Sequence, residues 1–375
     1  MRKIVYVTGT RADYGLMKET LDYIDRDEDL QLDVIATGMH LMDRHGNSLD
    51  EITNKNIHIV DEVIENDSYE AMGIFVGNLT SKLTKKISEI NPDIVLLLGD
   101  RGEMLAAAIA ASYLQIPIAH IHGGDISSTV DDVVRHVITK LSSIHFPATK
   151  KSASRIKQMG ESDDYIFISG APGLDSIAKI KYDENEILKK YDVQKPFALV
   201  LQHPVSLEVT ESGKQMKETL DALIQTDLDV IVIYPNSDAG SSAMMKEINK
   251  TSFNSYKNIP HDDFIALLDL CEVLVGNSSS GIIESGLFNL PVVNIGSRQD
   301  GREAGVNVIN CDYESREILD AINLALSDEF KEKIKDSQNP YGNGEAYKII
   351  TETLKDIKLE KQLLNKEFIE LIPNK

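Results

Sequence analysis

The segment Gly276–Gly281, GNSSSG, has the residue types that hold a phosphate group. Asn277 and three consecutive serines supply side-chain donors, and the two glycines allow the backbone to approach closely. The following GIIESG is expected to open a helix whose N-terminal amides attract an anion. A serine-rich helix cap is the structural alternative. Glu284, one turn on, is placed to accept both hydroxyls of a ribose, or else pairs with the helix dipole.

Basic side chains recur near the predicted ends of strands. Arg11, Arg101, Arg298 and Arg302 have this position, and a guanidinium binds phosphate in a bidentate manner. Arg298 and Arg302 fit structural salt bridges equally well. His203, in the segment QHP, is a candidate donor to a phosphate or a buried structural histidine.

Carboxylates form a second group of candidates for chemistry. Asp100 directly follows the apolar run DIVLLLG, and a carboxylate at the end of a central strand usually takes part in binding or catalysis. The structural alternative for Asp100 is an ion pair with Arg101. Asp125 follows two glycines. Asp131 precedes a helical segment, where it is either a reagent or a helix cap. Paired carboxylates suit general acid–base catalysis.

A metal site and a dinucleotide site are both disfavoured. His120 and His122 could share one face with Asp125, but no further strong ligand stands at a diagnostic spacing. Gly9 and Gly15 do not form GxGxxG. We therefore expect neither a metal nor a redox cofactor.

Short apolar runs alternate with longer amphipathic segments, which predicts parallel sheets covered by helices on both faces. In the first half we expect strands at Lys3–Val7, Leu32–Ala36, Ile57–Val63, Asp93–Leu98, Ile116–His120 and Ile166–Ser169, with helices at Ser68–Ile90, Gly102–Leu114 and Asp131–Ser143. In the second half we expect strands at Pro196–Leu201, Leu228–Tyr234, Val273–Val275 and Pro291–Ile295, with helices at Glu211–Thr226, Gly281–Phe288, Ser315–Leu326 and Gly344–Leu359.

The repeat of this pattern predicts an α/β protein with two doubly wound, Rossmann-like domains facing a central cleft. We place the first domain at 1–175 and the second at 186–340, with 341–375 as a helix and tail that pack back on the first domain. Ligands of such sheets bind beyond the carboxyl ends of strands. All the polar motifs named above follow predicted strands, so they are expected to line that cleft.

The composition excludes several classes of protein. The 375 residues carry 60 acidic against 39 basic side chains, a net charge of −21. This argues against partners such as nucleic acid or an anionic membrane. No run approaches the roughly 20 apolar residues of a membrane helix. Two cysteines, Cys271 and Cys311, and a first apolar run too short for a signal peptide fit a cytoplasmic protein.

Several motifs, taken together and in order, resemble one enzyme family. They are TGTRADYG, ATGMHL, LGDR, HIHGGD, VDDVVRHVITKLSSIHF, GNSSSGIIE and GSRQDGR, between about Arg2 and Ile350. The set is similar to the hydrolysing UDP-N-acetylglucosamine 2-epimerases of sialic-acid and legionaminic-acid pathways. The segment Arg11–Tyr14 favours this branch over the non-hydrolysing enzymes, which typically read GTRPE there.

The resemblance implies a GT-B fold with UDP mainly on the second domain. It places the catalytic carboxylates at Asp100 and Asp131, with His122 or Asp125 as the third group. It places contacts to UDP at Arg11, Arg101, His203, Asn236, Ser279, Ser280, Gly281, Glu284 and Arg298. It also implies a homodimer or homotetramer, and no metal.

The activity implied is conversion of UDP-N-acetylglucosamine and water to N-acetylmannosamine and UDP, through elimination to a glycal and hydration. Two groups on opposite faces of the sugar would handle the C2 proton. UDP-N,N'-diacetylbacillosamine is the alternative substrate. A GT-B glycosyltransferase and a non-catalytic UDP-sugar sensor are the alternatives from other classes.

Overall fold

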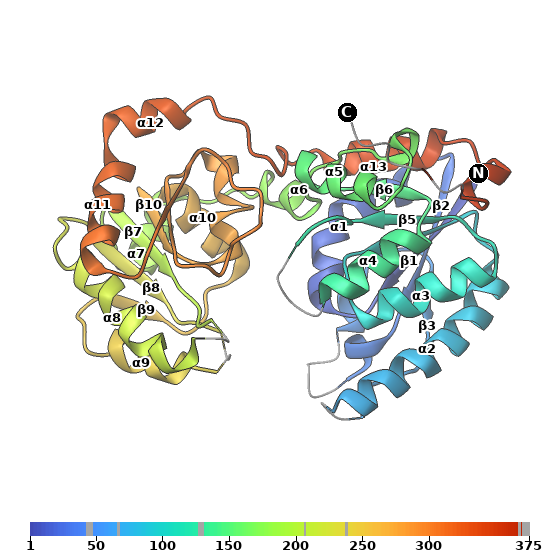
Figure 1. The fold of residues 1–375 in the computed structure, drawn as a ribbon, viewed down its shortest axis with the longest axis horizontal. Coiled ribbons are helices and arrows are strands. Elements are labelled where there is room, and N and C mark those ends of the chain that lie inside the picture. Colours follow the sequence, from blue (N-terminus) through green and yellow to red (C-terminus); the bar gives the residue numbers. More distant parts are fainter. Residues whose placement is uncertain are drawn as a thin grey trace. The chain divides into compact units, whose positions relative to one another are not determined.

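A computed structural model describes residues 1–42, 48–65, 68–126, 131–205, 208–236, 239–366 and 369 of the chain. The chain divides into two compact units, Met1–Ser176 with Gly342–Lys375, and Ile177–Tyr341. Each unit contains one parallel six-stranded sheet with helices packed around it (Figure 1). This confirms the predicted α/β class with two doubly wound halves. None of the described helices combines the length and apolar character required to span a membrane.

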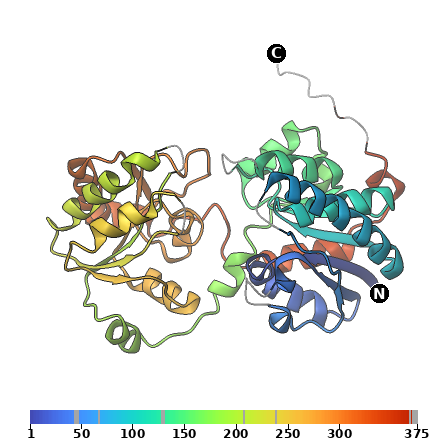
Figure 2. The same ribbon diagram turned by 90° about the horizontal axis from the view of Figure 1, so that it is seen from below.

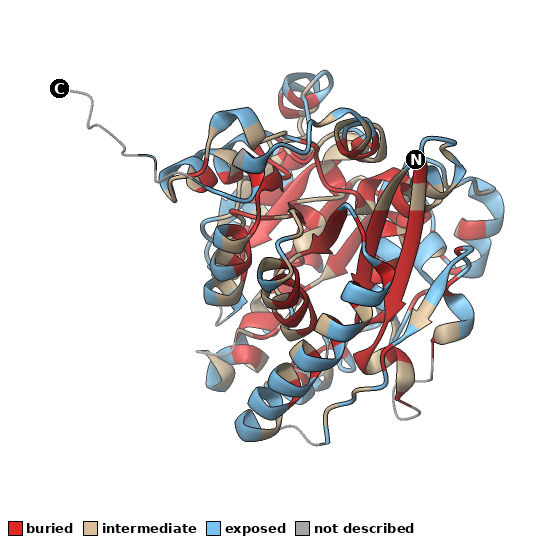
Figure 3. Ribbon diagram, turned by 90° about the vertical axis from the view of Figure 1, so that its right-hand side faces the viewer, coloured by how far each residue is buried: buried red, intermediate tan, exposed pale blue. Residues whose placement is uncertain are grey.

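The sheet of the first unit runs in the order β3-β2-β1-β4-β5-β6, and every neighbouring pair is parallel. Its strands are β1 Arg2–Thr8, β2 Leu30–Ala36, β3 Ile57–Ile59, β4 Ile94–Leu98, β5 Ile118–Ile121 and β6 Ile144–Phe146. Strand β4 and the segment Ile4–Val7 of β1 are wholly apolar because helices cover both faces of these central strands. Figure 3 shows these strands as the buried interior of the unit, beneath helices whose outer faces are exposed.

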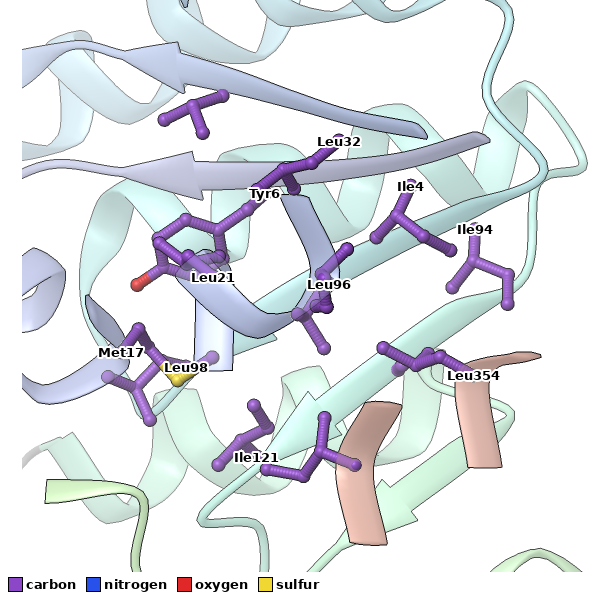
Figure 4. Close-up of a cluster of buried hydrophobic side chains, with 14 of the residues drawn as sticks. Ile4, Tyr6, Met17, Leu21, Leu32, Ile94, Leu96, Leu98, Ile121 and Leu354 are labelled. Carbon is purple, nitrogen blue, oxygen red and sulfur yellow. The ribbon is translucent and has the colours of Figure 1, made fainter. Parts of the chain in front are cut away.

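The helices of this unit are α1 Arg11–Arg26, α2 Tyr69–Ile90, α3 Gly102–Tyr113, α4 Asp131–Leu141, α5 Lys150–Gln158, α6 Gly173–Ile177, which runs one residue past the unit, and α13 Ala346–Asp356. Residues of α1 and α13 pack on one face of the sheet, and residues of α2 and α3 pack on the other. Figure 4 shows the first of these clusters, where Met17 and Leu21 of α1 meet Tyr6 and Leu96 of the sheet.

The last helix, α13, completes the core of the first unit. Ile350 and Leu354 are fully buried in the same cluster as Ile94 of β4. Figure 4 shows Leu354 near Ile94. The carboxylate of Asp175 accepts the backbone N–H groups of Ala346 and Tyr347, each at 2.8 Å, and so fixes the start of the helix.

The sheet of the second unit runs in the order β12-β11-β10-β7-β8-β9, again with parallel pairs. Figure 2 shows the helices that surround the strands of this unit from a second direction. Its strands are β7 Phe197–Leu201, β8 Asp229–Ile233, β9 Asn254–Tyr256, β10 Val273–Gly276, β11 Val292–Ile295 and β12 Val308–Cys311. Its helices are α7 Glu184–Lys190, α8 Ser212–Leu223, α9 Ser241–Ile248, α10 His261–Leu270, α11 Ser315–Leu326 and α12 Asp328–Ile334.

Two predicted elements are wrong. The sixth strand of the first sheet is β6, and the predicted strand Ile166–Ser169 makes only an isolated bridge between Ile166 and His145. The predicted helix Gly281–Phe288 consists of short 3₁₀ turns, Ser279–Gly281 and Ser285–Phe288, separated by a turn. The serine-rich loop is therefore not followed by a regular α-helix with a full dipole.

The order of strands locates where each sheet can bind a ligand. In the first sheet the chain order reverses between β1 and β4, and in the second between β10 and β7. Ligands of doubly wound sheets bind beyond the carboxyl ends of the strands at such a point. The segments Gly9–Arg11 and Gly99–Arg101 follow the first pair, and the segments Gly276–Gly281 and Gln202–Pro204 follow the second.

Candidate active site

Arg135 of α4 connects three acidic residues at the carboxyl edge of the first sheet. Its guanidinium forms an ion pair with Asp100, which lies two residues after the end of β4. It also contacts Asp132 at 2.6 Å and the backbone carbonyl of Asp125 at 2.8 Å. Arg135 is only 6% exposed, so these contacts are shielded from water and strong. One buried cation thus fixes Asp100 relative to the loop that follows β5.

His122 and Asp125 form a hydrogen-bonded pair in that loop. Nδ1 of His122 lies 2.9 Å from the Asp125 carboxylate, and the Ser152 hydroxyl donates to the other carboxylate oxygen at 2.6 Å. Burial acts to raise the pKa of Asp125, but the bonds from His122 and Ser152 and the charge of Arg135 hold it below its usual range. Asp125 is therefore an ionised acceptor that orients the imidazole, and Nε2 of His122 is the atom that can exchange a proton.

His120 has a structural role that separates it from His122. Its Nε2 lies 2.7 Å from the carbonyl of Gly99 and its Nδ1 lies 3.1 Å from the Thr139 hydroxyl. Burial lowers the pKa of His120 to about 3, so the ring is neutral at physiological pH. The described residues contain no group of three or more His, Cys, Asp and Glu side chains suited to a metal ion.

Arg101 is held by Glu103, a residue that sequence reasoning missed. The Glu103 carboxylate contacts Nε and Nη2 of Arg101 at 3.2 and 3.0 Å. Glu103 is 3% exposed and packs against Gly9 and Gly38, where an added Cβ would come within 2.8 Å of it. The sequence did contain an indication of a role for Glu103, because it is the single charged residue in the otherwise largely apolar segment Gly102–Tyr113.

Asp100, Arg101, Glu103 and Asp131 line one cavity of about 770 Å³ in the first unit. Asp131 lies in the first turn of α4, one residue before Asp132. The cavity is within the size range of small-molecule sites. Of the four residues proposed for catalysis, Asp100 and Asp131 line the cavity, and His122 and Asp125 are coupled to Asp100 through Arg135. Arg11 is exposed and pairs with Glu51 at 2.7 Å.

Asn277 organises the loops at the edge of the second sheet. Its Oδ1 accepts the backbone N–H of His203 at 2.7 Å, and its Nδ2 donates to the His203 carbonyl at 2.9 Å. The Asn277 carbonyl accepts Arg298 at 3.0 Å and Gln299 at 2.8 Å. These bonds bring together the segments after β7, β10 and β11, including the predicted residues His203 and Arg298. Gln299 was not predicted.

The His203 ring has a defined tautomer. The backbone N–H of Asn236 donates to Nδ1 of His203 at 3.1 Å, so Nε2 carries the proton and is the donor atom. Gly276, before Asn277, has φ +138°, and an added Cβ would lie 2.2 Å from the Leu201 carbonyl oxygen. Only glycine permits this close approach of the loops after β7 and β10.

Ser279, Ser280 and Gly281 form the 3₁₀ turn after β10, and Glu284 follows it. The Ser278 hydroxyl accepts the backbone N–H of Ser280 at 3.3 Å. Burial raises the pKa of Glu284, although Ser280 and the charge of Arg302 act to lower it. Its Oε2 atom is buried, and the described part of the chain offers it no hydrogen-bond partner. Val130, the first residue of the motif VDDVVRHVITKLSSIHF, lies outside the described residues.

The fold is that of nucleotide-sugar 2-epimerases of GT-B architecture. The chain belongs to the UDP-N-acetylglucosamine 2-epimerase family, whose model matches residues 22–355. It is 43% identical over 376 residues to UDP-N,N'-diacetylbacillosamine 2-epimerase (hydrolyzing) of Legionella pneumophila, covering 98% of this chain and 99% of that protein. It is 36% identical to a UDP-N-acetylglucosamine 2-epimerase of Neisseria meningitidis, covering 87% and 88%.

Solved structures agree with this assignment of the fold. The crystal structure of UDP-GlcNAc 2-epimerase from Neisseria meningitidis bound to UDP-GlcNAc matches with a TM-score of 0.77. The match covers 94% of this chain and 99% of that chain at 20% identity, a level at which the likeness is one of fold.

Proposed function

We propose that this protein is a hydrolysing 2-epimerase of a UDP-2-acetamido sugar, which releases UDP and inverts C2. Membership of the epimerase family supports the class of reaction. The observation that carries the proposal is the arrangement around Arg135, which couples Asp100 to the pair formed by His122 and Asp125 at the edge of the first sheet.

The chemistry requires groups that move a proton at C2. Departure of UDP from C1 creates oxocarbenium character, which acidifies the hydrogen on C2. A base removes that hydrogen and gives a glycal, after which water adds at C1 and a proton returns to C2 from the opposite face. Two faces of the sugar require two proton-handling groups. No oxidation or reduction takes place.

We assign the proton transfers to Asp100, Asp131 and His122. Asp100 and Asp131 line one cavity, and Asp100 is fixed there by Arg135. His122, oriented by ionised Asp125, presents an imidazole nitrogen that can accept or donate a proton. We therefore assign Asp125 the role of a positioning residue and His122 that of the third catalytic group.

The second unit offers the groups for UDP. His203 presents an N–H at Nε2, and Arg298, Ser279, Ser280 and the backbone at Gly281 add donors for a diphosphate. The buried Oε2 of Glu284 suits a ribose hydroxyl, which would supply its missing donor. Asn236 acts through its backbone on His203. Arg101, held by Glu103, and Arg11 are the further cations proposed for UDP.

Two substrates fit this proposal. The relative from Neisseria meningitidis supports UDP-N-acetylglucosamine, and the relative from Legionella pneumophila supports UDP-N,N'-diacetylbacillosamine. The freed 2-epimer would in either case supply the synthesis of a nonulosonic acid.

The test is to incubate the protein with each nucleotide sugar in D₂O and to follow UDP release and deuterium at C2. We expect both UDP and a C2-deuterated 2-epimer. Asp100→Asn should lose at least about 10²-fold in rate while UDP binding persists, the scale of acid–base assistance. Asp132→Asn, which removes another partner of Arg135, is the matched control and should lose less.

Three outcomes would contradict the proposal. UDP release without deuterium at C2 would exclude elimination and hydration. Transfer of the sugar to an added acceptor in place of water would indicate a glycosyltransferase. Binding of the nucleotide sugar without any turnover would indicate a sensor.

A further inference from the structure

Glu103 is a buried carboxylate that the proposed proton transfers do not use. It lies in the first turn of α3, the helix that follows β4, and is 3% exposed. Its carboxylate packs closely against the backbone of two loops. A Cβ added to Gly9, after β1, would lie 2.7 Å from Oε1 of Glu103, and one added to Gly38, after β2, would lie 2.8 Å from the same atom. Two glycines therefore make room for this one side chain.

The two oxygens of Glu103 bind one edge of the Arg101 guanidinium. Oε2 accepts Nε at 3.2 Å and Oε1 accepts Nη2 at 3.0 Å, a paired geometry that fixes the plane of the guanidinium. Residues two apart do not face each other on a helix. Arg101 instead precedes α3 with an extended backbone, φ −74° and ψ 158°, so its side chain can turn back to Glu103. The Arg101 side chain is 41% exposed, and this pair limits the rotamers that it can adopt.

The pair leaves a defined part of the guanidinium for a ligand. Of the five N–H donors of an arginine, Glu103 takes two, and Nη2 also contacts the sulfur of Met39 at 3.6 Å. Within the described part of the chain, Nη1 has no hydrogen-bond partner. Arg101 lines the same cavity as Asp100 and Asp131. The two N–H groups of Nη1 are therefore what Arg101 can offer to a ligand in that cavity.

We infer that Glu103 is a positioning residue, which holds Arg101 so that Nη1 binds the phosphate oxygen that leaves C1 of the nucleotide sugar. This inference rests on the proposed function. That oxygen gains negative charge as its bond to C1 breaks. A donor that is fixed in advance therefore stabilises the transition state more than the bound substrate. The charge of Glu103 offsets that of Arg101, so Glu103 contributes orientation and not attraction.

The first test measures kcat and KM for UDP release from UDP-N-acetylglucosamine and from UDP-N,N'-diacetylbacillosamine. In Glu103→Gln the side chain keeps its size but can accept only one of the two N–H groups. We expect kcat to fall by about tenfold to 10²-fold, the scale of a misplaced group. KM should not rise, because the variant removes a negative charge beside the phosphate.

Two results would overturn the role of Glu103 while leaving the epimerase intact. One is an unchanged kcat in Glu103→Gln, and the other is a raised KM with an unchanged kcat. Release of UDP from neither sugar by the wild type would overturn the proposed function itself.

A double-mutant cycle separates positioning from a general effect on the fold. If Glu103 acts only through Arg101, the combination of Glu103→Gln with Arg101→Ala should have a kcat no lower than that of Arg101→Ala alone. Losses that multiply would show that Glu103 acts independently of Arg101, and would overturn the inference.

Arg101→Lys tests Nη1 without changing the buried carboxylate. The ammonium group can still pair with Glu103, but lysine has no second edge to present to a ligand. The kcat of this variant should therefore fall about as far as that of Glu103→Gln. A kcat equal to that of the wild type would contradict the role of Nη1.

Glu161→Gln is the matched control. Glu161 is a buried carboxylate of the first unit, 4% exposed, which pairs with Lys140 and Lys366 and is outside the described lining of the cavity. Its replacement should leave kcat and KM unchanged even where it lowers the free energy of unfolding. An equal loss of kcat in Glu161→Gln would show that the loss of any buried ion pair is sufficient, and would overturn the assignment to Glu103.

Discussion

Asp13 is a buried carboxylate, 6% exposed, at the start of α1. It accepts the backbone N–H groups of Gly9 and Thr10 at 3.1 and 2.9 Å and the hydroxyls of Thr8 and Thr10. Burial outweighs these bonds and raises the pKa of Asp13 from 3.8 to about 6. The folded protein therefore binds this proton more tightly than the unfolded chain does, and the carboxylate form weakens the fold.

The free energy of unfolding of the first unit should consequently fall as pH rises from about 4 to 6. The full cost is about 3 kcal/mol at 1.36 kcal/mol per pKa unit. Asp13→Asn removes this titration. The free energy of unfolding of the variant, measured with urea, should therefore rise relative to that of the wild type as pH increases from about 4 to 6. Asp50→Asn, at an exposed carboxylate of the same unit, is the control. Equal slopes in the wild type and Asp13→Asn would disprove the raised pKa.

A functional role was predictable for single residues whose own position in the sequence was sufficient to indicate it. Asp100 stands out because it is a charged residue two positions after the end of the apolar run Ile94–Leu98. The contacts of Arg135 were not predictable, because they join residues 35 apart that meet only when α4 packs beside the end of β4. The same holds for Asn277, whose partner His203 is 74 residues away.

The loop after β10, which we propose as the diphosphate site, is not followed by a long helix. The 3₁₀ turn Ser279–Gly281 offers hydroxyls and a few amides, so side-chain donors should carry more of the affinity. Ser279→Ala combined with Ser280→Ala should raise the Kd of UDP at least about tenfold, because each bond to a charged acceptor contributes about 1.5 to 3 kcal/mol. Calorimetry measures this, with Ser255→Ala on the edge strand β9 as control. An unchanged affinity would be evidence against the loop as the diphosphate site.

At the level of elements, long periodic or continuously apolar segments were predictable and short ones were not. The helix Ser315–Leu326 has the bounds that its sequence pattern predicts. Strand β6 is only three residues long and contains His145 between two apolar residues. Its pattern is therefore too short to identify it as a strand from the sequence. Ile166–Ser169 has a similar apolar character but lies beside β6 at a single position. Pairing with the rest of the sheet, which sequence does not show, decides between them.

At the scale of the whole molecule, the charge of −21 opposes the approach of a diphosphate. Salt screens this long-range repulsion more than it screens contacts inside a pocket. UDP should therefore bind more weakly at low ionic strength than at moderate ionic strength, by titration at fixed pH. If affinity only decreases as salt is added, the local cations Arg11, Arg101 and Arg298 dominate instead.

The return of α13 to the first unit has a consequence for synthesis on the ribosome. Ile350 and Leu354 belong to the core that β1 and β4 share, yet they are made after the entire second unit. The second unit, Ile177–Tyr341, is one uninterrupted stretch of chain. It can finish folding as soon as it emerges, while the older first unit waits with an open apolar face. The first unit is thus the part of the nascent chain that a chaperone must protect longest, and a ribosome that stalls within residues 342–356 leaves that face uncovered.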